Sequence, residues 1–177
     1  MNFVKCHFEK VSFGEYITSR TNGADVSPEQ AEKYREEWEA IKLPQRATSG
    51  SAGYDFFAPY DFTVDNVRLD NTISTGIRWV SDCDGLVLML YPRSGLGFKH
   101  LMRLNNSTGI IDSDYSKSDN EGHIKARMTA VLHRDIKQGE AFMQGVIMPY
   151  FVCEDDDDFV KLTRNGGFGS TDNKTKN

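Results

Sequence analysis

The stretch IKARMTAVLH, residues 124–133, decides the fold class of this chain. Apolar and polar residues alternate along it with a period of two, which is the spacing of side chains on a β-strand that buries one face. The apolar set is Ile124, Ala126, Met128, Ala130 and Leu132, and the residues between them are Lys125, Arg127, Thr129, Val131 and His133. A half-buried strand is expected here.

Similar short runs, rich in β-branched and aromatic residues, recur elsewhere between glycine, aspartate and asparagine turns. After Pro44 no segment sustains a helical period over more than two turns, so the pattern predicts an all-β fold. Short strands at this spacing favour a jelly roll or β-barrel. The expected strands are residues 3–11, 54–57, 62–69, 73–80, 86–91, 124–133 and 145–152.

One additional helix is expected over about residues 27–43, after a polar, turn-rich stretch at 19–25. Residues 27–30, Ser-Pro-Glu-Gln, combine an N-cap serine, a proline at the first helical position and a glutamine three residues after the cap. Pro44 ends the helix, because a residue before proline avoids the helical conformation. The side chains at helical spacing, which favour a core face over a ligand platform, are Ala31, Tyr34, Trp38 and Ile41.

Length and charge bound the class of protein. A chain of 177 residues suits about one domain, and we expect a β domain over residues 1–163 followed by a flexible, glycine-rich arm over residues 164–177. The 26 acidic and 21 basic residues give a net charge of −5. This balance offers no field that would attract a nucleic-acid polymer or an anionic membrane.

The cysteines and the N-terminus indicate the compartment. Cys6, Cys83 and Cys153 are an odd number and form no C-x-x-C pair, so neither a disulfide framework nor a thiolate zinc site is expected. The first ten residues lack the apolar core of a signal peptide, and no run approaches the ~18 apolar residues of a membrane span. A cytoplasmic protein is the expectation.

Two glycine-bearing segments are candidates for binding phosphate or a base. In PRSGLG, residues 92–97, the backbone amides and the Ser94 hydroxyl could form an anion-binding nest, or the segment could be a hairpin turn with Arg93 in a surface ion pair. RNGGFGST, residues 164–171, has no Gly-Lys-Ser/Thr and no following helix, so it is not a Walker A loop. Phe168 in it suits packing on a ligand base or a neighbouring subunit, and the alternative is a disordered tail.

Two acidic segments stand out as well. In NNSTGIIDSDY, residues 105–115, a carboxylate near a phosphate could deprotonate a water that attacks phosphorus, or the two aspartates could be turn formers. The five consecutive carboxylates at 154–158 could hold a divalent cation. Consecutive side chains do not converge on one point, however, so a solvated connector is favoured.

Taken in order, these segments resemble the five motifs of the trimeric dUTPase family. The matching stretches are AGYD at 52–55, PRSGL at 92–96, residues 106–115, GEAFMQ at 139–144 and GGFGST at 166–171, so the resemblance covers about residues 44–172. It implies a jelly-roll-like homotrimer whose active sites lie between subunits and are closed by the C-terminal arm. It also implies Mg²⁺-dependent hydrolysis of dUTP to dUMP and pyrophosphate.

The resemblance also implies roles for single residues. Asp112 would be the general base for the water that attacks the α-phosphorus, with Arg93 supporting that carboxylate. Tyr115 would stack on the deoxyribose and exclude a 2′-hydroxyl, and Asp55 would help position a hydrated Mg²⁺. Further contacts to the substrate would come from Ser94, Gly95 and Gln144 at the phosphates, from Asn106, Gly109 and Ile111 in a hairpin that reads the uracil, and from Arg164, Phe168, Gly169, Ser170 and Thr171 in the arm, where Phe168 covers the base.

This chain departs from the family pattern at four places. Arg164 sits one residue nearer the Gly-Gly-Phe than is usual. Residues 116–121 are inserted where the family has Arg-Gly directly after the tyrosine, and Asn120 to His123 match an Asn-Glu-Gly-His run of some bacterial and phage members. Residues 141–143, Ala-Phe-Met, stand where motif four usually has Arg-Ile-Ala. The helix at 27–43 lies outside the common pattern.

Two alternative functions remain open. A dCTP deaminase would share the fold and nucleotide pocket but needs a glutamate on the strand after the third motif, and residues 123–132 contain no acidic residue. A dUTPase-like protein that binds nucleotide and regulates a partner is the second alternative.

Overall fold

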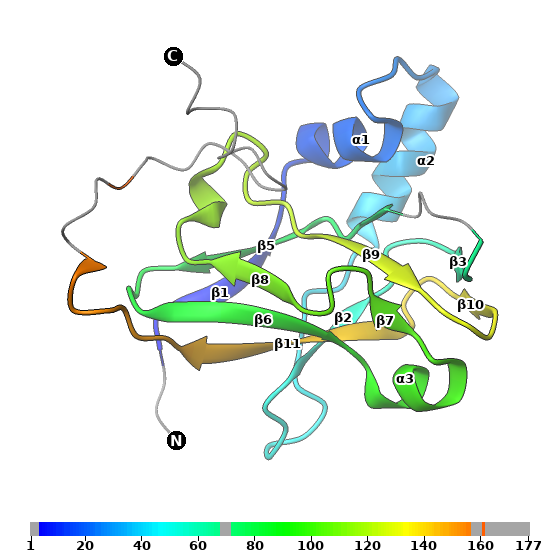
Figure 1. Ribbon diagram of the computed structural model, residues 1–177. Helices are drawn as coiled ribbons and strands as arrows, with labels where there is room; N and C mark the ends of the chain where they lie inside the picture. Colours follow the sequence, from blue (N-terminus) through cyan, green and yellow to red (C-terminus); the bar gives the residue numbers. More distant parts are fainter. Residues whose placement is uncertain (1–3, 68–71, 157–160, 162–177) are drawn as a thin grey trace, which may run out of the picture.

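The computed structural model describes residues 4–67, 72–156 and 161. Their centre is β6 (Leu86–Pro92), which lies in a four-stranded antiparallel sheet of order β2-β11-β6-β8 (Figure 1). The other strands are β2 (Tyr54–Phe57), β11 (Ala141–Pro149) and β8 (Gly109–Asp112). Leu86, Leu88 and Leu90 alternate along β6 and are all buried, so one face of this strand belongs to the core.

Three smaller antiparallel sheets surround this one. β4 (Thr72–Ser74), β9 (Lys125–Thr129) and β7 (Arg103–Leu104) form one; β1 (Cys6–Lys10) pairs with β5 (Ile77–Ser81); and β3 (Phe62–Val64) pairs with β10 (Arg134–Ile136). Over the described residues none of the strand orders closes on itself, so the fold is mostly β but built of open sheets, and the expected barrel closure is not observed.

The predicted helix is confirmed at its start. α2 (Pro28–Glu39) has Ser27 as N-cap, and the side chains of Ser27 and Gln30 form the reciprocal capping box. It ends at Glu39, four residues before the expected boundary, and buries none of its own side chains fully. Trp38 nevertheless packs against the core, and its Nε1 donates to the Val11 carbonyl at 2.9 Å.

Two further α-helices show that the all-β prediction is wrong in detail. α1 (Phe13–Thr21) includes residues 19–21, which were expected to be a turn, and α3 (Ser94–His100) replaces the expected loop after β6. A 3₁₀ turn, η1 (Tyr115–Lys117), follows β8. In Figure 1, α1 and α2 lie together above the sheets, and α3 lies below them, just after the C-terminal end of β6.

The expected strand boundaries need several corrections. Residues 54–57 are confirmed as β2, and the expected strand 86–91 is β6 with one more residue. The run 73–80 is split because Gly76 takes a φ of +70°, which turns the chain between β4 and β5. The strand at 124–133 ends at Thr129, and Leu132 is 54% exposed. β3 is shorter than expected, β11 starts and ends earlier, and β7, β8 and β10 were not predicted.

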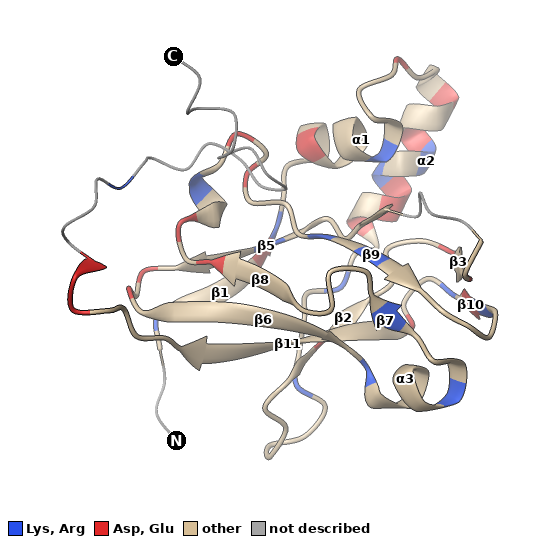
Figure 2. Cartoon of the chain, in the orientation of Figure 1, with Lys and Arg blue, Asp and Glu red and all other residues tan. Residues whose placement is uncertain are grey.

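Charged residues are spread over the described surface. Figure 2 shows Lys and Arg on the helices, on strands of several sheets and near α3, without a single basic stripe in the part of the chain that is drawn in colour. All three cysteines are free, as expected. Among the described residues no helix is both long and apolar enough to cross a bilayer.

Candidate functional site

The residues of motifs one, two and four meet at the C-terminal end of β6. Gln144 on β11 lies opposite Asp55 of β2 on one side and opposite Tyr91 of β6 on the other. The Arg93 guanidinium, just after β6, binds the Asp55 carboxylate at 3.1 Å from Nε to Oδ1. Gln144 Nε2 donates to the Pro92 carbonyl at 3.3 Å. We call Asp55, Arg93, Ser94, Gly95 and Gln144 the Asp55 cluster.

A close approach explains the glycine of motif one. A Cβ on Gly53 would lie 2.5 Å from Oε1 of Gln144. Any side chain at this position would therefore push the glutamine amide out of the cluster.

The segment after β6 combines parts of the two interpretations given for residues 92–97, an anion-binding nest and a hairpin turn. Arg93 forms a partly exposed ion pair, as in the turn interpretation, but the chain continues as α3 instead of a hairpin. Ser94 and Gly95 open that helix, where the first backbone N–H groups have no acceptor within a helix. No neighbour lies within 4 Å of the Cβ position of Gly95. These amides are therefore suited to bind an anion.

The residues of motif three lie on the hairpin-like turn from β7 to β8, two strands that belong to different sheets, and on β8 itself. Asn106 is in its turn, which Leu104 and Ser107 close by a bridge. Gly109 packs on Leu90, with its Cβ position 3.0 Å from that side chain, and Ile111 is 9% exposed. Asp112 ends β8 opposite Val87. We call this set, with Tyr115, the Asp112 hairpin.

The Asp55 cluster and Asp112 are far apart within one copy. Arg93 follows Val87, the register partner of Asp112, by six residues, and at ~3.3 Å per residue that is roughly 20 Å. An arginine side chain cannot bridge this distance. Within one chain Arg93 pairs with Asp55 instead, so the predicted support of Asp112 by Arg93 stays a prediction that requires a second copy.

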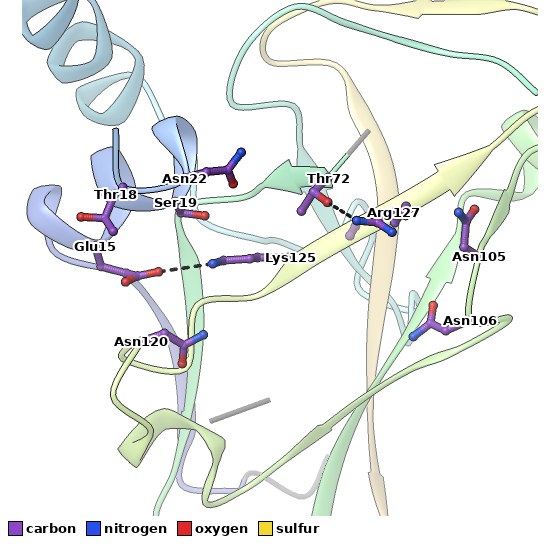
Figure 3. Close-up of a pocket in the computed structure, with 12 residues that line it drawn as sticks. Glu15, Thr18, Ser19, Asn22, Thr72, Asn105, Asn106, Asn120, Lys125 and Arg127 are labelled. Carbon is purple, nitrogen blue, oxygen red and sulfur yellow. Dashed lines mark hydrogen bonds and ion pairs between the residues drawn. The ribbon is translucent and has the colours of Figure 1, made fainter. Parts of the chain in front are cut away.

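A cavity of about 660 Å³ lies between the Asp112 hairpin, β9 and α1 (Figure 3). Asn105 and Asn106 line one side, and the opposite side is formed by α1. Lys125 and Arg127 of β9 project into the space between them, where Arg127 donates to the Thr72 hydroxyl at 3.0 Å. The lining residues from α1 are Glu15, Thr18 and Ser19, and Asn22, the C-cap of α1, follows them.

These α1 residues are the part of the site that the sequence interpretation missed. A start signal was present, because Ser12 caps α1 and Glu15 stands three residues after it. Gly14 and the β-branched Ile17, Thr18 and Thr21 hid the helix, since these residue types weaken a helical pattern.

The described residues fit a weakly held magnesium ion better than a closed metal cage. Asp55 is the predicted contact to the ion, and one of its oxygens is bound by Arg93. No group of three or more His, Cys, Asp or Glu side chains gathers in the described part of the chain. Magnesium commonly uses one or two carboxylates together with water and substrate phosphates, and Asp55 suits that arrangement.

Other predicted residues lie elsewhere. Arg164, Phe168, Gly169, Ser170 and Thr171 are outside the described residues, as is the whole of the expected arm, residues 164–177. In the acidic run, residues 154 and 155 are exposed and Asp156 pairs with Lys161 at 2.8 Å, which agrees with a solvated connector up to residue 156. Residues 157 and 158 lie outside the described residues.

Two relatives that are similar in sequence share the same name. The chain is 40% identical over 136 residues to the deoxyuridine 5'-triphosphate nucleotidohydrolase of Lactococcus lactis, with 74% of this chain and 88% of the relative covered. It is 41% identical over 143 residues to the protein of the same name from Hahella chejuensis, with 76% and 89% covered.

The fold and the family model agree with these relatives. A dUTPase crystal structure from Streptococcus mutans superimposes with a TM-score of 0.60 at 29% identity, covering 84% of this chain and 98% of that chain. The dUTPase of phage phi11 of S. aureus, at 19% identity and a TM-score of 0.53, shares the fold over 71% of this chain and 92% of its own. The dUTPase family model matches residues 39–171. The chain belongs to the dUTPase family.

Proposed function

We propose that this chain hydrolyses dUTP to dUMP and pyrophosphate in active sites that assemble between the copies of a homotrimer. The observation that carries the proposal is the division of the motif residues into two sets, the Asp55 cluster and the Asp112 hairpin. Neither set alone contains both the phosphate contacts and the candidate base. The relatives' name, a dUTP nucleotidohydrolase, supports the substrate and disfavours the deaminase alternative.

In the proposed reaction, the Asp112 carboxylate accepts a proton from a water molecule whose oxygen attacks the α-phosphorus. The bond between the α-phosphorus and the bridging oxygen breaks, and pyrophosphate leaves with the electron pair. Ser94, Gln144 and the first amides of α3 bind phosphate oxygens. Arg93 of a neighbouring copy adds positive charge beside Asp112, which stabilises the carboxylate as the base.

Asp55 would hold a magnesium ion through water. The ion, when bound, neutralises charge on the phosphates.

Asn106 and the main chain at Gly109 and Ile111 read the uracil edge, and Tyr115 packs on the deoxyribose. We place the boundary of the β domain at residue 163. The arm, residues 164–177, closes the site with Phe168 over the base and Arg164, Gly169, Ser170 and Thr171 near the outer phosphates. Three free cysteines and a nucleotide substrate suit the cytoplasm.

The reaction is tested with dUTP, dTTP, dCTP and UTP in the presence of Mg²⁺, scored for pyrophosphate and ammonia. We expect pyrophosphate from dUTP and little product from the other nucleotides. Ammonia from dCTP would support a deaminase, and binding of dUTP without turnover would support a regulatory protein.

The assembly is tested by complementation between two variants. Asp112→Asn and Arg93→Ala should each lower turnover by at least about a hundredfold. In trimers formed from an equal mixture, about one quarter of the sites combine an intact Asp112 with an intact Arg93 from different copies, so activity should return. A mixture of Asp112→Asn with Asp112→Ala is the control and should stay inactive. If the first mixture also stays inactive while the wild type hydrolyses dUTP, assembly between copies is refuted and the reaction is not.

A further inference from the structure

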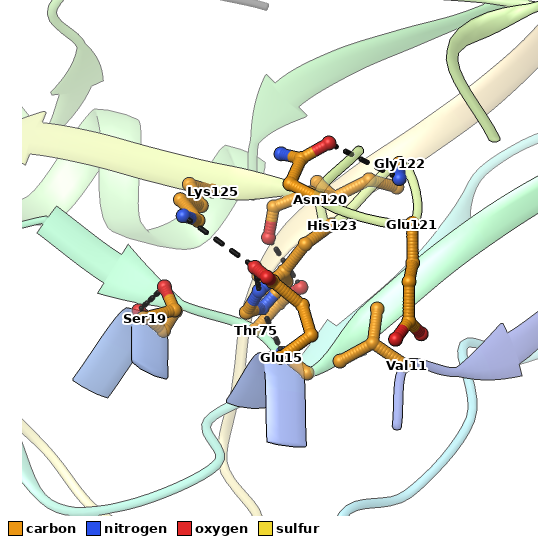
Figure 4. A network of polar contacts seen from close by, with 12 residues as sticks. Val11, Glu15, Ser19, Thr75, Asn120, Glu121, Gly122, His123 and Lys125 are labelled. Atoms are coloured by element: carbon orange, nitrogen blue, oxygen red, sulfur yellow. Dashed lines mark hydrogen bonds and ion pairs between the residues drawn. The ribbon is translucent and has the colours of Figure 1, made fainter. Parts of the chain in front are cut away.

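A buried polar network joins α1 to the turn at residues 120–123 (Figure 4), and this turn contacts Tyr115 of the Asp112 hairpin. Its centre is His123, whose side chain is fully buried. Nε2 of His123 accepts from the Gly76 N–H at 2.9 Å, so in the neutral ring the proton lies on Nδ1. Nδ1 faces the Glu15 carboxylate of α1 at 2.9 Å. The same carboxylate oxygen lies 3.7 Å from Lys125 Nζ.

The other side of this network reaches Tyr115. The Tyr115 hydroxyl donates to the His123 carbonyl at 3.2 Å and accepts from Asn120 Nδ2 at 2.9 Å. Asn120 Oδ1 in turn accepts from the Gly122 N–H at 3.2 Å. Both the donor and the acceptor function of the hydroxyl are thus used, and they fix the direction of the phenol ring.

Glu121 adds a second connection to α1. Its carboxylate accepts from the backbone N–H of Ser12 at 2.7 Å and from the Ser12 hydroxyl, and Ser12 is the N-cap of α1. Burial tends to raise the pKa of Glu121, but the bonds from Ser12 outweigh it, and the pKa lies below its usual range. Residues 120–123 therefore bind Tyr115 on one side and α1 on the other.

α1 lies outside residues 39–171, the part of the chain that matches the family model. We infer that Glu15 is a positioning residue for Tyr115, and that α1 thereby sets how strictly the site separates deoxyribose from ribose. This inference rests on the proposed function, because Tyr115 is the residue proposed to pack on the sugar.

The geometry explains how one contact on α1 can act at a distance. Removing the Glu15 carboxylate leaves the buried Nδ1–H of His123 without its acceptor, and a buried unpaired donor is unfavourable enough to move the ring. A shift of His123 moves its carbonyl, which is the acceptor of the Tyr115 hydroxyl. The ring of Tyr115 then gains freedom, and a 2′-hydroxyl is tolerated more easily.

The test compares binding of α,β-imido-dUTP and α,β-imido-UTP, which avoids any dependence on turnover. Glu15→Ala should lower the dUTP-to-UTP affinity ratio about tenfold, which corresponds to one hydrogen bond of ordinary net strength. Glu15→Gln, whose amide oxygen can still accept from Nδ1, should restore most of the ratio. Glu32→Ala removes an exposed carboxylate from α2 and should leave the ratio unchanged.

A second substitution separates positioning from general damage to the fold. In a Tyr115→Phe background the hydroxyl is already absent, so Glu15→Ala should have little additional effect on the ratio. An unchanged ratio in folded Glu15→Ala, or the same loss in both backgrounds, would overturn the inference. If Glu15→Ala does not fold, Glu15→Asp, whose carboxylate is one methylene shorter and cannot hold the same contact to Nδ1, takes its place in both backgrounds. A wild type that binds the dUTP analogue selectively but releases no pyrophosphate from dUTP overturns the proposed function and not this inference.

Discussion

Replacing Gly122 by alanine tests the packing between the 120–123 turn and the Tyr115 segment. Gly122 has a φ of +73°, and a Cβ there would lie 2.5 Å from Cα of Ser116, 2.8 Å from the Tyr115 carbonyl oxygen and 2.9 Å from the Ser116 nitrogen. All three neighbours are backbone atoms, which cannot rotate away as the end of a side chain can. The backbone itself must shift.

Two costs add up in Gly122→Ala. A left-handed conformation costs a residue with a Cβ about 1–2 kcal/mol. Forcing an extra methyl group against packed atoms costs about 1–3 kcal/mol more. We therefore expect the free energy of unfolding to fall by about 2–5 kcal/mol, a large share of the stability of an ordinary domain.

Urea denaturation at a fixed protein concentration measures this change through the midpoint and slope of the transition. Gly50→Ala is the matched control, because nothing lies within 4 Å of its Cβ position and its φ is not in the left-handed region. It should change stability by no more than about 0.5 kcal/mol. A loss below about 1 kcal/mol in Gly122→Ala would refute the packing described here.

Two further predictions concern stability. Burial holds the pKa of His123 below its ordinary 6.5, although Glu15 opposes this shift, so the unfolded chain binds a proton that the folded chain does not. Stability should decrease below about pH 6.5 by up to about 1.4 kcal/mol per pH unit until the folded-state pKa is reached. His123→Gln should flatten the dependence of the free energy of unfolding on pH in that window. If the variant and the wild type lose stability in parallel, the loss does not come from His123. Ser27→Ala removes the N-cap of α2 and should cost about 1 kcal/mol in the same urea assay, whereas no loss would show that α2 does not depend on its cap.

Elements that are stabilised by contacts or patterns within a few residues could be predicted from the sequence. The start of α2 follows from Ser27, Pro28 and Gln30, which act within one turn. β2 follows from a short aromatic run, and the alternation in β9 agrees with the burial of Ala126 and Met128. In each case the stabilising contact or pattern lies inside the element.

Elements whose stabilising partners lie far away in the sequence could not be predicted from it. The N-cap of α1 is bound by Glu121, 109 residues further along the chain, and β7 has two residues whose partners lie on β9. α3 contains Gly95 and Gly97, which have low helix propensity. The motifs identified the candidate residues one by one, but the register of β6 determines which of them meet, and register is not visible in the motifs.

The pairing of β6 on both sides keeps Arg93 and Asp112 apart within one copy. Seven residue pairs join β6 to β11 and four join it to β8, and its inward leucines are buried, so it cannot fold back to bring Arg93 to Asp112. Under the proposed assembly, each copy would offer two separate half-sites. Because α1 and residues 120–123 hold the Tyr115 side within a single copy, that half would be ordered before the proposed assembly. Preformed surfaces lose less conformational entropy on association, and we therefore expect α1 to favour assembly as well as selectivity.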